Sequence, residues 1–516
     1  MIKDRYIIIF LSLLFLIVAI PRIIFPELDH GDEFADACTL NAGKNFEKFG
    51  FIRCRFLPFY EPQIDTPNNP YTHYPPLPEI LNGIIRIISK SDSLRIYRII
   101  SLFFSLLNLI FWYLFLKNIT KNSFIAFLGS IFYFTNPYFI FGVDSIREQS
   151  LADFFRSLVL FSFVKILDIP KEKQKKFWLI LWFIIFLESL ITLDYIVYLS
   201  LFIVLFKYLF KKELSFTIIL LLILAPVFGF ALHFFQNSWY FKSIPNAIED
   251  FKNIAVDRII KSKDAPLERF DFFIWWNFVI VRYFSLIFSF SYFILGIFVF
   301  VGYLLYRFLS KTIKKEIIFL LKLLLVIGIC GISWYVVFPA HSFAHAFVPY
   351  LVRHLVPVGS IFYTLFFYIT WNYIRDKSKH KYFLKLLWFF LFLMVLFTSI
   401  TNSDLPITKE RIILSKDFLI FKNCLLNLKN RSNPKDIIGV NYYRFPFMRY
   451  YTDRSMMPIF NKSFFEEKNT FPKYFIFITR NDPVSKELYD FLTKRYKEIY
   501  TCNSIRFPSI FFELKE

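Results

Sequence analysis

Long apolar segments constrain this chain more than any other feature of its sequence. Eleven segments have about the length that a helix needs to cross the ~30 Å hydrocarbon core of a bilayer. They are Tyr6–Phe25, Leu94–Leu116, Phe124–Phe141, Leu151–Leu167, Phe177–Leu193, Tyr195–Phe210, Leu214–Leu232, Leu286–Leu309, Ile317–Phe338, Leu351–Tyr373 and Phe383–Ile400. Of the 516 residues 56% are hydrophobic and only 20% charged, a balance that excludes a single soluble enzyme. We predict a polytopic α-helical membrane protein with about 11 transmembrane helices.

The basic residues between these segments predict the orientation. The five basic loops are Lys117–Lys121, Lys171–Lys176, Lys211–Lys212, Lys311–Lys315 and Arg375–Lys381. With eleven spans, all five lie on the side of the N-terminus, which the positive-inside rule makes cytoplasmic. Cytoplasmic Lys and Arg also explain the net charge of +21, so we expect a membrane location and no nucleic-acid partner.

A further apolar stretch, Pro75–Ser89, is short and interrupted by Pro78, Glu79 and Arg86. Counting it as a full span would place all five basic loops outside, against the positive-inside rule. We therefore predict an interfacial or re-entrant helix there.

The remaining segments are predicted to face outward. We expect a transmembrane domain over residues 1–400, with a first outer loop at 26–74 and a second at 233–283, which contains an amphipathic stretch at Ile244–Ile260. Residues 401–516 are predicted to form a small extracytoplasmic α/β domain. Its expected strands and helices are Asp436–Val440, Tyr474–Thr479, Lys416–Leu428 and Ser485–Lys497. Without a glycine-rich phosphate loop, this domain is given no catalytic role.

Four of the five cysteines are predicted to lie outside the membrane on the outer side. Cys38 and Cys54 belong to the first loop, and Cys424 and Cys502 to the tail. Both pairs are compatible with disulfides in an oxidising compartment, and equally with buried reduced thiols.

The sequence Asp29-His30-Gly31-Asp32-Glu33 follows the first span directly. Ionisable groups so close to hydrocarbon are costly and are usually paired or functional. Asp32 and Glu33 suit a general base and a neighbouring carboxylate, or the ligands of a divalent cation. The alternative is a solvated acidic turn that caps a helix starting near Phe34.

Three further motifs carry candidate site residues. In the segment from Tyr71 to Glu79, paired prolines fix the backbone around His73 and Glu79. Asp144 and Arg147 lie between two spans, where Arg147 suits binding of a phosphate through its planar guanidinium.

The last motif joins His341 and His345, spaced to share a helix face, with Arg353 and His354. Such a pair suits a metal ion or an anionic group. Each of the motifs also has a purely structural explanation as a helix cap, a surface ion pair or a hydrogen-bonding histidine.

Taken together, the pattern resembles the GT-C glycosyltransferases. The shared features are an uncleaved first span, an outer loop that opens with Asp32-Glu33, the return His73-Tyr74-Pro75-Pro76, a carboxylate after the next pair of spans and a small outer α/β tail. The nearest groups are the protein O-mannosyltransferase and aminoarabinose-transferase-like enzymes of glycosyltransferase family 39. The chain departs from that pattern by carrying Asp29 and Gly31 before the acidic pair.

The resemblance implies an inverting transfer of a sugar from a polyprenyl-phosphate-linked monosaccharide to an acceptor on the extracytoplasmic face. It makes Asp32 the catalytic base, Glu33 its neighbour and Asp144 a second carboxylate, which together with His73 and Glu79 shapes the site. Arg147 and Arg353, with His341 and His345, are the expected phosphate-binding residues, and Lys242 is a further candidate. If a divalent cation takes part, Asp32, Glu33 and Asp144 would hold it. The acceptor is a lipid, a glycan or a protein.

Two alternative functions are a polytopic transporter or lipid flippase, and another membrane enzyme such as a glycan polymerase or a ligase acting on lipid-diphosphate glycans. A transporter would place ionisable groups near the bilayer midplane, often in related halves. Here most acids and histidines are predicted at one surface, and Glu188 is the main exception.

Overall fold

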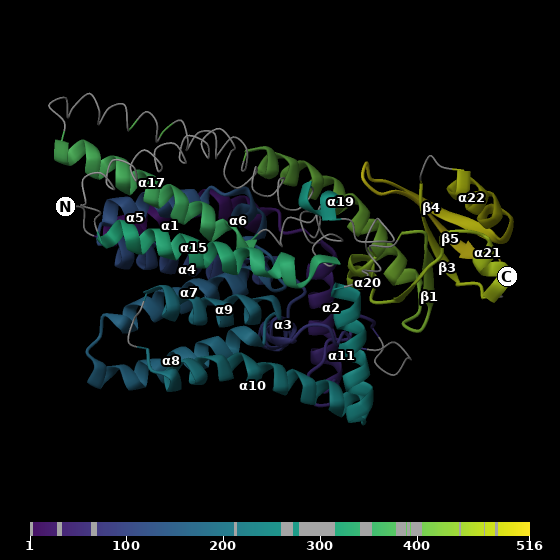
Figure 1. Ribbon diagram of the computed structural model, residues 1–516. Helices are drawn as coiled ribbons and strands as arrows, with labels where there is room; N and C mark the ends of the chain where they lie inside the picture. Colours follow the sequence, from purple (N-terminus) through teal and green to yellow (C-terminus); the bar gives the residue numbers. More distant parts are fainter. Residues whose placement is uncertain are drawn as a thin grey trace. The chain divides into compact units, whose positions relative to one another are not determined.

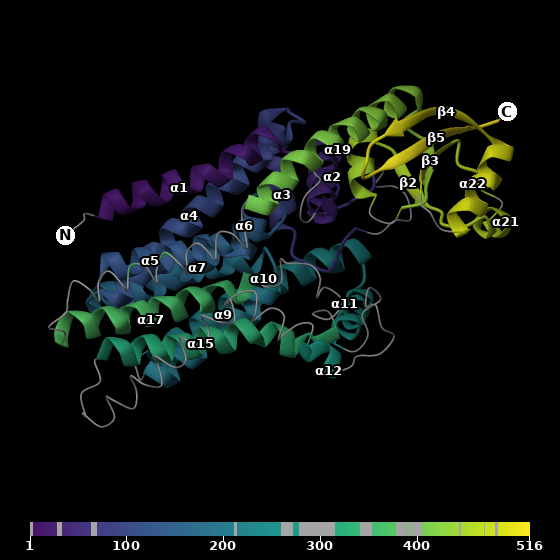
Figure 2. The ribbon, with the colours of Figure 1, turned by 90° about the horizontal axis from the view of Figure 1, so that it is seen from above.

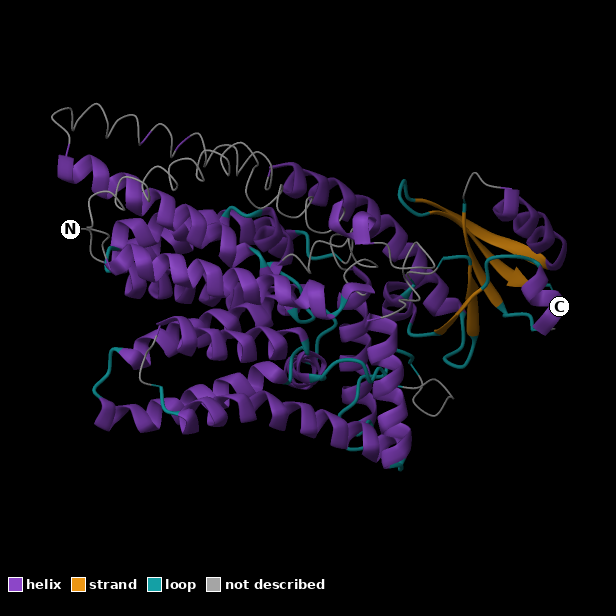
Figure 3. Cartoon of the chain, in the orientation of Figure 1, coloured by secondary structure: helices purple, strands orange, loops and turns teal. Residues whose placement is uncertain are grey.

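The computed structural model describes most of the chain. The described residues are 4–27, 33–62, 70–210, 214–259, 272–277, 315–340, 353–377, 389, 393, 405–442, 445–468, 470–479 and 483–515. Their contacts group into two compact units. Unit 1 contains residues 1–20, 73–75 and 99–407, and unit 2 contains residues 21–72, 76–98 and 408–516. Helices run through the apolar part of the chain, and the strands belong to its C-terminal part (Figures 1 and 3).

Nine of the eleven predicted spans coincide with helices. These helices are α1 (Asp4–Ile24), α4 (Leu94–Thr120), α5 (Ser123–Phe134), α6 (Pro137–Gly142), α7 (Gln149–Leu167), α8 (Lys171–Ser189), α9 (Asp194–Phe210), α10 (Phe216–Phe241), α15 (Lys315–Val337) and α17 (Val356–Lys377). By length and apolar composition, α1, α4, α10 and α15 each suffice to cross a membrane, and α5, α9 and α17 contain shorter apolar stretches. The spans predicted at 286–309 and 383–400 lie outside the described residues, apart from residues 389 and 393. The polytopic helical fold class is confirmed, and the number of spans and their orientation stay predictions.

Two predicted boundaries were wrong. The segment Phe124–Phe141 is not one helix, because Asn136 caps a new helix by accepting a hydrogen bond from the Tyr138 amide and Pro137 occupies its first turn. Helix α10 continues to Phe241, so His233 lies buried within a helix and not in a loop that begins there. The amphipathic stretch is confirmed as α11 (Ile244–Ile259), which packs against α10.

Within unit 1, helices pack through aromatic side chains. Helix α8 contacts α7, α9 and α10 (Figure 1). Helix α15 contacts α9 and α17 (Figure 2). Phe163 of α7 packs edge to face against Phe202 and Phe206 of α9. Trp112 of α4 stacks on Tyr133 of α5 and donates a hydrogen bond to Ser360 of α17 over 2.9 Å. Such pairs add about 0.5–1.5 kcal/mol each to the burial of apolar area.

In unit 2, α2 (Glu33–Phe49), from the predicted first outer loop, packs against α3 (Leu77–Ser89), which belongs to the apolar stretch after that loop. Helix α3 has 13 residues, about 20 Å of helix, which is too short for a full span. This length agrees with the interfacial or re-entrant helix predicted at Pro75–Ser89, which stays a prediction. The two helices approach closely at Gly83, where an added Cβ would lie 2.8 Å from the Cβ of Phe46.

The tail forms a five-stranded mixed sheet. Its strands are β1 (Ile437–Val440), β2 (Ser455–Pro458), β3 (Tyr474–Ile478), β4 (Tyr496–Asn503) and β5 (Pro508–Leu514), in the order β2-β1-β3-β5-β4. Strand β1 is parallel to β2 and β3, whereas β5 is antiparallel to β3 and β4. The predicted strands at 436–440 and 474–479 are confirmed, while β2, β4 and β5 were not predicted.

Helices cover both faces of this sheet. On one face α21 (Ser463–Lys468) and α22 (Pro483–Arg495) bury Phe465, Leu488 and Leu492 against Phe475 and Phe512. On the other face the phenylalanines of α19 (Leu405–Arg431) and α20 (Pro446–Thr452) pack around Phe507. The small α/β character of the tail is therefore confirmed. The division at residue 400 stays a prediction.

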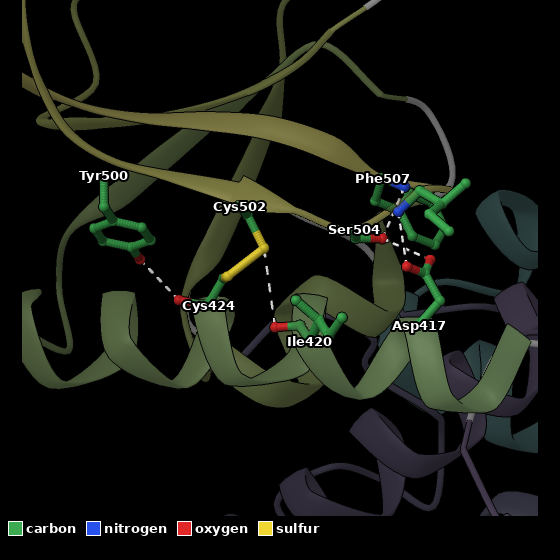
Figure 4. Close-up of a disulfide and its surroundings, with 8 residues drawn as sticks. Asp417, Ile420, Cys424, Tyr500, Cys502, Ser504 and Phe507 are labelled. Carbon is green, nitrogen blue, oxygen red and sulfur yellow. Dashed lines mark hydrogen bonds between the residues drawn. A yellow bond between two sulfur atoms is a disulfide. The ribbon is translucent and has the colours of Figure 1, made fainter.

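A disulfide and a carboxylate fasten α19 to the sheet (Figure 4). Cys424 on α19 is bonded to Cys502 on β4, whereas Cys38 and Cys54 are buried thiols that form no disulfide. About two helix turns before Cys424, Asp417 accepts hydrogen bonds from the Ser504 hydroxyl and from the amides of Ile505 and Arg506 over 2.7–3.0 Å. The sequence allowed either disulfides or buried thiols: the pair in the tail forms a disulfide, and the pair in the first loop consists of buried thiols.

Candidate functional site

Tyr74 and Glu148 link three arginines from separate segments of unit 1: Arg147 and Arg258 lie over the Tyr74 ring, and Glu148 lies within ion-pair distance of Arg147 and Arg353. Arg147 lies in the turn between α6 and α7, Arg258 at the end of α11, and Arg353 just before α17. All three side chains are mostly buried: Arg258 is 5% exposed, Arg353 3%, and the side chain of Arg147 14%. Buried guanidinium groups are costly unless they meet acids or an anionic ligand, so this convergence marks a site.

Tyr74 occupies the His73-Tyr74-Pro75-Pro76 return that the sequence singled out. The guanidinium of Arg258 lies 4.4 Å from the centre of the Tyr74 ring, and that of Arg147 lies 5.4 Å from it. Arg258 also donates a hydrogen bond to the carbonyl oxygen of His73 over 3.3 Å. The return therefore holds Arg258 through a backbone oxygen and both arginines through a π face.

Glu148 is the acid that faces these arginines. Its carboxylate lies 2.7 Å from Nε of Arg147 and 3.9 Å from Nη1 of Arg353. Both carboxylate contacts are buried, which strengthens them relative to surface ion pairs. Glu148 thus holds two of the three guanidinium groups, those of Arg147 and Arg353, close to each other.

Behind the cluster, Arg156 anchors the Arg353 backbone. Arg156 is fully buried on α7, and its Nη1 donates hydrogen bonds to the carbonyl oxygen of Arg353 over 3.0 Å and to the Tyr195 hydroxyl over 3.1 Å. Asp153 lies 3.1 Å from Arg156 and accepts a hydrogen bond of 2.6 Å from Tyr195. The Tyr195 ring in turn lies 5.3 Å from the Arg353 guanidinium. This network fixes the segment that carries Arg353.

The described residues bring together only part of the predicted site. His73 contributes its carbonyl oxygen, and Arg147 and Arg353 share Glu148, as described above. Asp144 is buried, at 2% exposure, in the turn that also carries Arg147. His354 is buried beside the Tyr195 ring, with ring centres 4.8 Å apart.

Other predicted site residues lie elsewhere. Glu79 belongs to unit 2, where it accepts hydrogen bonds from Thr39 over 3.4 Å and from Tyr60 over 3.5 Å. Lys242 is exposed at the end of α10. Asp32, His341 and His345 lie outside the described residues, as does the side chain of Glu33, although Glu33 begins α2 as the predicted helix near Phe34 requires.

Within the described part of the chain, no three His, Cys, Asp or Glu side chains are grouped to hold a metal ion. A site formed by Asp32, Glu33 and Asp144 includes two residues beyond that part. A divalent cation therefore stays a prediction.

Sequence reasoning missed Arg258, Glu148 and the pair Asp153–Arg156. Two signals were present: Arg258 lies on the same helix turn as the apolar residues that end the amphipathic stretch, and Asp153 and Arg156 are charges inside a predicted span. Charges within a span usually face the protein interior and mark function or its support.

Solved structures identify the fold. The crystal structure of ArnT from Cupriavidus metallidurans bound to undecaprenyl phosphate aligns with a TM-score of 0.57 at 10% sequence identity, over 97% of each chain. The apo state of the same protein aligns with a TM-score of 0.53 at 11% identity, again over 97% of both chains. The chain therefore shares the fold of ArnT over nearly its whole length. No family model and no curated protein matches the sequence. The resemblance to GT-C enzymes is thus confirmed at the level of the fold.

Proposed function

We propose that this GT-C-type protein is a glycosyltransferase that takes a sugar from a polyprenyl-phosphate-linked monosaccharide and transfers it, with inversion, to an acceptor at the extracytoplasmic face of the membrane. The observation that carries the proposal is the chain of contacts that brings three buried arginines together: Arg258 and Arg147 at the Tyr74 ring, and Arg147 and Arg353 at Glu148. A solved structure with the same fold is described as bound to undecaprenyl phosphate, which supports a donor of this chemical class.

The arginines would act on the leaving group. When the bond between the sugar C1 and the phosphate oxygen breaks, the electron pair stays on the polyprenyl phosphate, whose charge increases. Planar guanidinium groups pair with phosphate oxygens through two parallel hydrogen bonds. Held in place by Glu148, Tyr74 and the His73 carbonyl, they stabilise that charge without reorganising during the reaction. His341 and His345 are further candidates for the same role.

The acids would act on the acceptor. Asp32 takes the proton of the acceptor hydroxyl or amine as its oxygen or nitrogen attacks C1 from the face opposite the phosphate. Glu33 and Asp144 orient this base, or together with it hold a divalent cation. Glu79 and the His73 side chain shape the surrounding segment. The sugar is a hexose or a pentose, and the acceptor a lipid, glycan or protein.

A donor panel tests the proposal. Purified full-length protein in nanodiscs is mixed with radiolabelled polyprenyl-phosphate monosaccharides and a membrane extract that supplies acceptors. We expect transfer from at least one donor by the wild type, and a loss of at least about 100-fold in Asp32→Asn with donor binding retained. Full activity of Asp32→Asn would remove Asp32 as the base.

The same experiment separates the transporter alternative. If no donor turns over, and reconstituted protein moves polyprenyl-phosphate sugars between leaflets at a rate that Asp32→Asn does not change, transport replaces transfer as the function. Empty nanodiscs and empty liposomes measure the background of the transfer assay and of the transport assay.

A further inference from the structure

A cavity of about 370 Å³ in unit 2 belongs to none of the sites described so far. It lies where α1 ends, where α4 begins and along one face of α19. Its lining combines apolar side chains, Ile24 and Leu419, with charged ones, Glu27, Arg95, Lys416 and Lys422. A pocket with these two kinds of wall fits an amphipathic ligand.

The acids at this cavity are already neutralised. Glu27 accepts hydrogen bonds from Lys422 over 3.3 and 3.4 Å and from the Tyr451 hydroxyl over 3.2 Å. Asp92 forms an ion pair of 2.6 Å with Arg86 and one of 4.0 Å with Lys44. Although burial opposes it, these two cations lower the pKa of the Asp92 carboxyl, which keeps it ionised and paired.

Two cations at the rim remain in excess. Arg95 and Lys416 are exposed, and neither forms an ion pair with any other residue that the structure describes. Arg95 also lies in the first turn of α4, a 27-residue helix whose N-terminal end carries partial positive charge. The cavity therefore has a surplus of positive charge on two sides.

A buried hydroxyl also lines the cavity. Ser415 is 2% exposed, and its Oγ has no hydrogen-bond partner among the described residues. A buried hydroxyl without a partner costs about 1–3 kcal/mol, and a ligand oxygen in the cavity would remove that cost. The hydroxyl, the helix end and the two cations point to an oxyanion.

The apolar wall indicates that this oxyanion belongs to a lipid. Ile24, 53% exposed, is the last residue of α1, a helix long and apolar enough to cross a membrane. Leu419, 45% exposed, stands one helix turn from Ser415 on α19. A phosphate bound beside Ser415 would thus have exposed apolar side chains next to it for the start of an acyl chain.

The opposite side of α19 is fixed, which keeps the cavity wall in place. Asp417 and Cys424 attach this helix to the end of β4 and the segment after it through hydrogen bonds and the disulfide (Figure 4). Ser415, Leu419 and Lys422 follow one another at helical spacing on the side that lines the cavity.

We propose that this cavity binds the phosphate-bearing headgroup of an anionic membrane lipid, with Arg95 and Lys416 pairing with the phosphate and the Ser415 hydroxyl donating a hydrogen bond to it. The site is independent of the proposed sugar transfer, because it shares no residue with the arginine cluster or with the predicted catalytic acids.

Lipid titration of purified full-length protein tests this. Native mass spectrometry from detergent micelles measures binding of dioctanoyl phosphatidylglycerol, dioctanoyl phosphatidylcholine and inorganic phosphate. We expect the wild type to prefer phosphatidylglycerol. Because each cation near an anionic lipid contributes about 1 kcal/mol, Arg95→Gln with Lys416→Gln should weaken that binding by about 30-fold. Ser415→Ala should weaken it by about fivefold, the value of one neutral hydrogen bond.

A charge-matched control removes two exposed lysines of the same unit, Lys435→Gln with Lys497→Gln, and should leave binding unchanged. The proposal is overturned if this control loses as much affinity as the cavity variants, or if phosphatidylcholine binds as tightly as phosphatidylglycerol. Inorganic phosphate that binds as tightly as the lipid would assign the cavity to a soluble anion and overturn the lipid assignment. Circular dichroism before each titration verifies that the variants are folded.

Discussion

In unit 2, buried basic side chains meet acids from distant parts of the chain, whereas in unit 1 two arginines share one glutamate and one of these two shares a tyrosine ring with a third arginine. The unit 2 pairs join the first outer loop to the start of α4 and to the tail: Arg98 with Asp36, Lys422 with Glu27, and Arg449 with Glu61. Each of these pairs matches one charge with one opposite charge.

The difference separates two uses of a buried charge. A matched pair satisfies itself, so its removal leaves an unpaired charge and lowers stability. Arginines that gather at a ligand site act on the ligand, so the removal of one of them should lower ligand affinity or turnover more than stability. The following predictions test this distinction.

The largest expected effect is on the stability of unit 2. Asp36→Asn leaves Arg98, which is 1% exposed, without its carboxylate at 2.6 Å. We expect the free energy of unfolding to fall by about 3–5 kcal/mol, because one charge of a buried pair is left uncompensated. Chemical denaturation of purified protein in detergent micelles measures this loss.

The control is an exposed pair, Lys121 with Asp168, whose side chains are 63% and 45% exposed. Asp168→Asn should change stability by less than about 1 kcal/mol. Equal losses in the two variants would contradict the assignment of Arg98–Asp36 as a structural pair.

Next comes turnover in unit 1. Arg258→Gln removes the guanidinium from Tyr74 and should reduce sugar transfer by about 10²–10³-fold, as expected for a group that stabilises charge in the transition state. Its unfolding midpoint should stay near that of the wild type. Steady-state transfer assays together with thermal denaturation give both readouts.

Lys242→Gln is the matched control, since Lys242 is an exposed cation that the sequence also suggested for phosphate binding. We expect it to keep wild-type turnover. If Arg258→Gln lost stability in proportion to activity, the arginine cluster would be structural like the pairs of unit 2.

A third prediction concerns the disulfide of unit 2. Replacing both Cys424 and Cys502 by serine removes a covalent crosslink between residues 78 positions apart. We expect a loss of about 2–4 kcal/mol in the free energy of unfolding, because the unfolded chain gains freedom. Chemical denaturation with and without reductant measures it. Reductant should destabilise the wild type and leave the double variant unchanged; an equal effect on both proteins would assign the loss to another cause.

Sequence patterns predicted what depends on local composition. Nine of the predicted apolar runs coincide with helices, and short apolar segments such as Tyr474–Ile478 were correctly predicted as strands. Strand β4 was missed for two reasons. Its sequence, Tyr-Lys-Glu-Ile-Tyr-Thr-Cys-Asn, lacks a clear alternation of apolar and polar residues, and the helix predicted at 485–497 covers its first two residues. The joining of the first loop to the tail could not be predicted either. It depends on contacts such as the hydrogen bond of 2.9 Å from Asn41 to the Pro446 carbonyl, between residues 405 positions apart.

The candidate site likewise contains residues that the sequence predicted and one that it could not predict. Arg147 and Arg353 were predicted because arginine beside predicted outer helix ends suits phosphate, and both take part in the cluster. Arg258 joins them only through the fold, which brings the end of α11 to the His73-Tyr74 return. No spacing in the sequence relates two residues 185 positions apart.

The smallest expected effect tests an exception to the matched pairs of unit 2. Lys44 donates a hydrogen bond of 2.5 Å to the Tyr450 carbonyl, while the carboxylate of Asp92 is 4.0 Å away and closer to Arg86. Burial lowers the pKa of Lys44 from 10.5 to about 8, and Asp92 offsets only part of that shift. Below pH 8 the amine is charged in both the folded and the unfolded state, and the full cost of burying the charge is present.

Between pH 8 and 10.5 the unfolded chain binds more protons at this position than the folded one, so stability rises with pH by at most about 1.4 kcal/mol per pH unit. Lys44→Met should remove this slope, whereas Lys435→Met, at an exposed position, should keep it. Denaturation across pH 7.5–10 gives the difference between each variant and the wild type, which cancels the titration of all other groups. If the free energy of unfolding of Lys44→Met still rose with pH as in the wild type, the burial of the Lys44 charge would be offset as fully as that of the paired cations around it.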